Sequence, residues 1–82
     1  MTVEENWAVA AERVRDYFVQ EMNAKLVSDG LLCDGCRISL SPCEGKVGIW
    51  KIPRTQIRIE GPDEDVKALY HRFYIRFISA GG

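Results

Sequence analysis

The sequence predicts an α+β domain in which two helices pack on one face of a three-stranded antiparallel sheet, in the order α-β-β-β-α. Apolar residues recur at helical spacing near both ends of the chain, whereas in its middle they alternate with polar residues as strands do. The segments between these patterns are short and contain glycine or proline. At 82 residues, of which 46% are hydrophobic and 28% charged, the chain is expected to form a single domain over 1–82.

The first element is expected to be one amphipathic helix over residues 3–28. At about 100° per residue, Trp7, Val14 and Phe18 fall on one side of such a helix, whereas acidic residues fall opposite. Asp29-Gly30 is expected to end it, because glycine readily takes the left-handed conformation that follows many helices.

Three strands are expected in the middle of the chain, over residues 36–41, 46–52 and 55–60. In the first of them Ile38 and Leu40 alternate with polar neighbours. Residues 42–45 (Pro-Cys-Glu-Gly) have the composition of a turn, and Pro53-Arg54 interrupts the apolar run. Because all connections are short, the strands are expected to form an antiparallel meander.

A second helix is expected to begin after Gly61-Pro62. The acids at positions 63–65 suit the positive end of a helix dipole. Apolar and aromatic residues then recur at spacings of three and four, which predicts a buried face. That face consists of Val66, Leu69, Tyr70, Phe73 and Phe77.

The charge balance excludes a protein whose whole surface is built to bind phosphate. The net charge is −1, but residues 1–36 carry seven acids and three bases, whereas residues 37–82 carry five acids and eight bases. A basic face is therefore expected only in the second half of the chain. The first residues show no secretion signal, and no apolar run approaches the ~20 residues that span a bilayer. We expect a cytoplasmic protein with reduced cysteines and no membrane contact.

The cysteines are the sharpest chemical signal in the sequence. Cys33 and Cys36, two residues apart around a glycine, are typical of a knuckle that points two sulfurs at one metal ion. The sequence predicts a structural zinc held by Cys33, Cys36 and Cys43, with His71, the only histidine, as the leading fourth ligand. Inert reduced thiols and a redox pair are the alternatives to zinc. Other candidates for the fourth ligand are Asp29, Asp34, Glu44 and a water.

The middle strand offers one candidate partner-binding surface. If Val47 and Ile49 point inward, alternation places Trp50 outward, between Arg37 and Arg58 on the flanking strands. Arg54 extends the same basic group. A tryptophan among arginines is typical of a protein hot spot or of a platform on which a base stacks. The opposite register places Trp50 in the core.

The second helix offers another candidate surface. His71, Ile75 and Ile78 fall on the side away from its buried face, with Arg72 and Arg76 one turn apart beside them. Exposed isoleucines next to arginines indicate a partner surface, unless the first helix covers them.

The order α-β-β-β-α resembles the double-stranded-RNA-binding domain across most of the chain. That family grips phosphates with a lysine cluster at the start of its second helix. The corresponding residues here are Pro62-Asp63-Glu64-Asp65, which repel phosphate. Duplex RNA binding by that route is therefore not expected.

The final Gly81-Gly82 is similar to the tail of sulfur-carrier and ubiquitin-like proteins, whose terminal glycine carboxylate is activated. That resemblance implies that residues 73–79 form a strand leading into the tail, and it keeps a sulfur-carrier-like protein as an alternative function. Enzyme activity is not expected, because the chain has one histidine and lacks a nucleophile elbow, a phosphate loop and an HExxH motif.

In size and style the chain resembles the small inhibitors that phages and mobile elements make against host nucleases, such as anti-CRISPR proteins. The resemblance rests on no residue motif. It implies an inhibitor or adaptor that binds a larger host protein of the nucleic-acid-processing, CRISPR type. We therefore expect a protein-binding module stabilised by a structural zinc ion. The second choice is a nucleic-acid-binding module that uses the arginine–tryptophan face.

Overall fold

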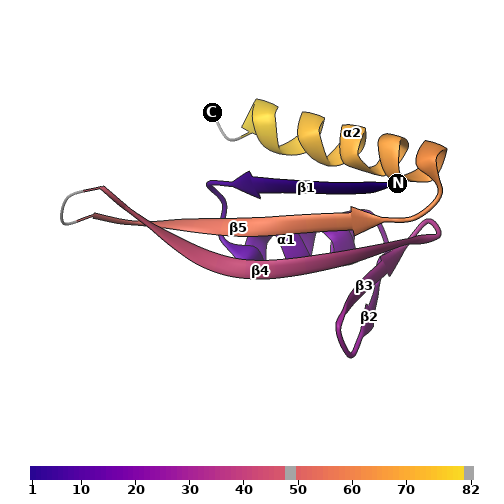
Figure 1. Ribbon diagram of the computed structural model, residues 1–82, viewed down its shortest axis with the longest axis horizontal. Coiled ribbons are helices and arrows are strands. Elements are labelled where there is room, and N and C mark those ends of the chain that lie inside the picture. Colours follow the sequence, from indigo (N-terminus) through magenta and orange to yellow (C-terminus); the bar gives the residue numbers. More distant parts are fainter. Residues whose placement is uncertain (48–49, 81–82) are drawn as a thin grey trace.

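The protein is an α+β fold built on a five-stranded antiparallel sheet with the strand order β1-β5-β4-β3-β2 (Figure 1). The computed structural model describes the backbone of residues 1–47 and 50–80 and the side chains of residues 1–43 and 53–78. The predicted fold class and the antiparallel sheet are confirmed, whereas the predicted number of three strands is wrong. The strands are β1 (Thr2–Trp7), β2 (Lys25–Val27), β3 (Gly30–Cys33), β4 (Cys36–Val47) and β5 (Trp50–Glu60).

The single helix expected over residues 3–28 is wrong. The segment contains β1, a short helix α1 (Ala11–Asp16), a π-helical turn η1 (Tyr17–Glu21) and β2. β1 pairs with β5 from Thr2↔Glu60 to Trp7↔Thr55, so its backbone hydrogen bonds come from a strand about fifty residues away. Local periodicity cannot reveal such a long-range ladder. The element order begins with a strand, so the topological resemblance to the double-stranded-RNA-binding domain does not hold.

Two other expected boundaries are wrong, because β4 and β5 run through the predicted turn at 42–45 and the predicted break at Pro53-Arg54. The ladders explain why these prolines are tolerated. β3 pairs with β4 only up to Ile38, and β1 pairs with β5 only from Thr55 onward. Backbone groups alternate in direction along a strand, and at Pro42 and Pro53 they point toward these unpaired edges. Neither proline therefore removes a ladder hydrogen bond.

The second helix, α2 (Asp63–Ala80), is confirmed, and residues 73–79 are helical rather than a strand. All of its predicted inward residues are buried except Tyr70, which is half-buried. Gly81-Gly82, on which the sulfur-carrier alternative depends, lies outside the described residues. Among the helices that the structure describes, none is long and apolar enough to cross a membrane.

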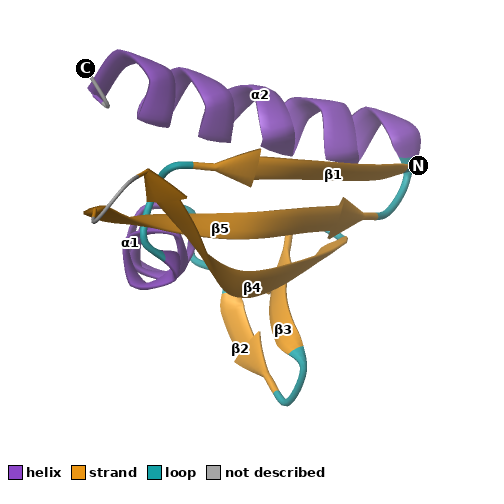
Figure 2. Ribbon diagram, turned by 60° about the vertical axis from the view of Figure 1, so that its left-hand side comes forward, coloured by secondary structure: helices purple, strands orange, loops and turns teal. Residues whose placement is uncertain are grey.

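Both helices contribute to one core on the same face of the sheet. The ring of Phe18 in η1 stacks on Phe73 in α2 at 5.8 Å, and Tyr17 meets Phe77 edge-on at 5.3 Å. Beneath them, inward residues of β4 and β5 such as Ile59 are fully buried. On that face α2 runs along β1, whereas α1 lies nearer β4 and β5 (Figure 2). The opposite face of the sheet carries the polar residues of the strand alternation.

Candidate functional site

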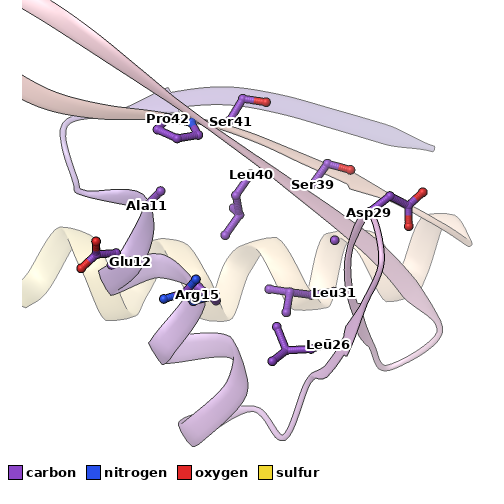
Figure 3. A pocket seen from close by; sticks show the side chains of 11 residues that line it. Ala11, Glu12, Arg15, Leu26, Asp29, Leu31, Ser39, Leu40, Ser41 and Pro42 are labelled. Atoms are coloured by element: carbon purple, nitrogen blue, oxygen red, sulfur yellow. The ribbon is translucent and has the colours of Figure 1, made fainter.

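A pocket of about 450 Å³ opens between α1, the β2–β3 hairpin and β4 (Figure 3). Leu31 and Leu40 extend into it, and Leu26 lies at its lower side. Leu31 is buried, whereas Leu26 is 63% exposed. The pocket therefore has an apolar interior that solvent reaches. Its lining residues are Ala11, Glu12, Arg15, Leu26, Asp29, Gly30, Leu31, Ser39, Leu40, Ser41 and Pro42.

The pocket lies along the edge of β4. Ser39, Leu40, Ser41 and Pro42 are consecutive, and consecutive strand residues point to opposite faces of a sheet. Four consecutive strand residues can all line one pocket only where the edge of the strand has no paired neighbour. The backbone of β4 is thus part of the pocket wall.

Gly30 shows why β4 loses its neighbour at this point. A Cβ on Gly30 would lie 2.3 Å from the carbonyl oxygen of Ile38, so only glycine allows this close approach. Gly30 also pairs with Val27, because the chain turns through Ser28-Asp29 to form the β2–β3 hairpin. Because β3 begins at Gly30, the β3–β4 ladder stops at Ile38. Among the residues that the structure describes, β5 is the only strand that pairs with β4 beyond that point.

The register identifies the backbone groups that face the pocket. Cys33 and Cys36 pair across a two-residue turn, so they exchange both hydrogen bonds and the groups of Cys36 point toward β3. The direction alternates along the strand, so Ile38, Leu40 and Pro42 also point to that side. Beyond Ile38, this leaves the N–H and C=O of Leu40 and the C=O of Pro42 facing the open edge.

The charges at the rim of the pocket cancel. Asp29 forms an ion pair with Arg37 at 2.8 Å between Oδ2 and the guanidinium. Glu12 and Arg15 carry opposite charges and lie on neighbouring turns of α1. Glu12 and Asp29 lie at opposite ends of the pocket (Figure 3). An uncharged occupant fits this distribution better than a polyanion does.

The predicted zinc knuckle is the closing pair of a β-hairpin. Asp34 and Gly35 have φ values of 50° and 79°, the two left-handed residues of a type I′ turn. Cys33 and Cys36 point inward and are 4% and 0% exposed. Burial raises the pKa of both thiols above the ordinary value, and nearby carboxylates, Asp34 for Cys33 and Asp65 for Cys36, act in the same direction.

The structure does not bring the four predicted zinc ligands together. Cys43 lies seven residues after Cys36 on the same strand, roughly 23 Å along it at 3.3 Å per residue. Cys43 also points to the opposite face, where its sulfur accepts a hydrogen bond from Asn6 Nδ2 at 3.3 Å. His71 is exposed on α2. Among the described side chains, no group of three or more histidine, cysteine, aspartate and glutamate residues is placed to hold a metal ion. Zinc binding stays a prediction, which elemental analysis of protein purified without chelator tests.

The predicted sheet-face arginines are brought together on the face that the helices leave open, but each has a protein partner. Arg37 pairs with Asp29, and Arg58 lies 3.4 Å from Glu60 and 3.6 Å from Glu4. Arg54 donates a hydrogen bond to Asn6 Oδ1. The side chain of Trp50 lies outside the described residues, so its predicted outward position stays a prediction.

The predicted surface on α2 is exposed, and helix α1 does not cover it. Ile75 and Ile78 are 50% and 52% exposed, and His71 and Arg72 are exposed beside them. Arg76 forms an ion pair with Glu21 of η1 at 3.1 Å. This face is a second apolar surface, without the open backbone that marks the pocket.

Sequence reasoning misses the pocket, because three of its walls come from segments that helical spacing places in one long helix or that no clear pattern covers. The available signal was the dipeptide Asp34-Gly35, a strong marker of a two-residue hairpin turn when apolar residues flank it. That hairpin leads to β3 and to its end at Gly30. Searches against protein-family models, curated proteins and solved structures find no match to this chain.

Proposed function

We propose that the chain is a small protein-binding module that engages a larger protein through the pocket beside β4. The observation that carries this proposal is a solvent-open apolar pocket next to an unpaired sheet edge. An adaptor or inhibitor works in this way, by occupying a surface of its partner. A host protein that processes nucleic acid, of the CRISPR type, is the partner class that the chain's resemblance in size and style implies.

The exposed leucine supports the proposal energetically. Complete burial of a leucine side chain contributes about 1.5–3 kcal/mol, and Leu26 keeps 63% of its surface in water. Covering it therefore adds roughly 1–2 kcal/mol to an association. Exposed apolar residues beside a pocket with a polar rim are typical of protein interaction sites.

The nucleic-acid alternative has less support. A phosphate-binding face needs cationic side chains that are available to phosphate. Arg37 instead lies 2.8 Å from Asp29 in the β2–β3 turn, and Arg58 lies within 4 Å of Glu4 and Glu60 on the same face. Electrophoretic mobility shifts with single-stranded and duplex nucleic acid, measured at low and high salt, test this alternative directly.

A capture experiment with matched variants tests the proposal. Wild type, Leu26→Glu, Leu32→Glu and Ile78→Glu are immobilised and exposed to an extract of the producing cells. Leu32 lies on β3 beside the pocket but points to the opposite face, and it is 41% exposed. We expect a protein captured in a fixed ratio by wild type, Leu32→Glu and Ile78→Glu and lost with Leu26→Glu. Loss of capture with Ile78→Glu alone would instead assign the interface to α2. Equal capture by wild type and all three variants would show that neither the pocket nor the α2 surface binds the partner.

A further inference from the structure

The open edge of β4 has the hydrogen-bonding pattern of a strand that lacks its neighbour. Beyond Ile38, the backbone groups of alternate residues point away from β5, beginning with Leu40 and Pro42. β4 continues in this state to Val47. The residues whose backbone groups face the open edge recur every two positions, about 6.6 Å apart. This spacing is also the two-residue repeat of an extended peptide.

We propose that the partner segment binds as an added β-strand along the edge of β4, in line with β3, and inserts one apolar side chain into the pocket. The inference rests on the proposed function, because it names the form in which the partner binds. The occupant is an extended, uncharged stretch of a protein chain. Main-chain hydrogen bonds give such complexes their affinity, and side-chain pockets give them specificity.

The charge at the site complements this occupant. Of the charged residues that line the pocket, Glu12 and Arg15 have opposite signs, and Asp29 is paired with Arg37 outside the lining, so no positive field favours a phosphate or another polyanion. What remains to be paired at the edge is neutral backbone. An added strand also continues a ladder that the fold has already begun between β3 and β4.

The strand register assigns the side chain that enters the pocket. The inner-face row contains Leu26, Leu31 and Ile38, which pair directly across β2, β3 and β4. Leu40 lies on the same face, two residues along β4. A partner residue opposite Leu40 therefore directs its side chain inward, between Leu26, Leu31 and Leu40. Its two chain neighbours lie beside Ser39 and Ser41 and point to the other face. The expected motif is one apolar residue between two polar ones.

Pro42 removes one hydrogen bond from the ladder that an added strand can form beside the pocket. It offers a carbonyl oxygen to an added strand but no N–H, and prolines on edge strands protect native sheets from uncontrolled pairing. Two hydrogen bonds at Leu40 and one at Pro42 are available within the pocket. We therefore expect a partner to need the side-chain pocket in addition to edge pairing.

A peptide selection tests the inference without knowledge of the natural partner. A phage library of random decapeptides is selected on wild-type protein and counter-selected on Leu26→Glu, with Leu32→Glu as the control that retains binding. The selected peptides are then synthesised with single backbone N-methyl groups at successive positions. We expect N-methylation to weaken binding about tenfold or more at alternate positions, where an N–H faces β4, and less than about threefold at the positions between.

Other outcomes overturn the inference. Equal effects at successive positions would show that the peptide is not paired as a strand, and failure to enrich any peptide over Leu26→Glu would show that the edge does not bind extended chains. If the capture experiment finds a pocket-dependent partner whose peptides show no alternation, strand addition fails and the proposed function stands. If N-methylation weakens peptide binding at alternate positions but no cellular protein needs Leu26 for its capture, the proposed function fails and the strand-binding edge stands.

Discussion

Three thiols in one chain occupy two chemically different environments. Cys33 and Cys36 are buried between the sheet and the helices, and burial raises the pKa of both, so little of either is thiolate near neutral pH. Cys43 is exposed on the outer face beside Asn6. The reactivity of a thiol depends on both its thiolate fraction and its access to solvent. Cys33 and Cys36, which give the strongest signal in the sequence, are therefore expected to react more slowly than Cys43.

Alkylation with iodoacetamide at pH 8 is therefore expected to add one group per native chain rapidly, at Cys43. The two hairpin cysteines are expected to react at least tenfold more slowly, because local or global opening must precede their modification. Mass spectrometry of peptides from timed samples gives the three rates. Cys43→Ser should remove the fast phase, and unfolding in urea should equalise the remaining two. A native Cys33 or Cys36 that reacts as fast as Cys43 would contradict the buried hairpin.

At the level of elements, the sequence is informative where neighbours in space are also neighbours in the chain. The buried face of α2, with Val66 and Phe73, follows from helical spacing alone. β1 does not, because its partner strand β5 is about fifty residues away and gives Val3 and Trp7 their inward direction. The helical pattern that extends through Trp7 is a coincidence of spacing, and pairing along the β5 edge overrides it.

The pocket could not be predicted for the same reason. It depends on where the β3–β4 ladder stops, which is set by the start of β3 at Gly30 after the turn from β2. The cysteine spacing in 33–36 was readable, but its interpretation needed the φ values of Asp34 and Gly35. Those φ values show that the two cysteines close a β-hairpin, and metal binding by this pair stays a prediction.

Amide hydrogen exchange of the free protein tests the open edge. Ser39 and Ser41 have N–H groups that point toward β5, and the N–H of Ile38 points toward β3. In the described part of the chain, no strand pairs with β4 on the side to which the amide of Leu40 points. This amide is therefore expected to exchange at least about tenfold faster than these three neighbours, although it lies within a long strand. Residue-resolved NMR measures all four. Equal protection of Leu40 and Ile38 would show that the edge is covered in solution.

At the scale of the whole molecule, the two faces of the sheet have different roles. The inner face binds both helices through one aromatic cluster, and the outer face is left with charges that pair among themselves, such as Arg58 with Glu4 and Glu60. A small domain buries a limited area, so its stability depends on few residues. The pocket lies at the edge of the inner face, beside α1, where the helices stop covering the sheet. Binding there needs no opening of the core.

Phe73 is the residue on which this architecture most depends. Its ring meets Trp7 of β1 at 5.0 Å, Phe18 of η1 at 5.8 Å and Phe77 at 4.8 Å, and it is fully buried. Phe73→Ala is expected to lower the free energy of unfolding by about 3–5 kcal/mol, which is a large part of the stability of a domain this size. Urea unfolding followed by tryptophan fluorescence measures the loss.

The neighbouring Tyr74 provides the matched control. It also contacts Trp7, at 5.6 Å between ring centroids, but it is 41% exposed. Tyr74→Ala is expected to cost about 1 kcal/mol, because its contacts are fewer and no cavity is left in the core. If Phe73→Ala does not fold, Phe73→Leu retains much of the buried volume and is expected to lose about 1–2 kcal/mol. Equal losses for Phe73→Ala and Tyr74→Ala would show that α2 is not joined to η1 and β1 through a shared core.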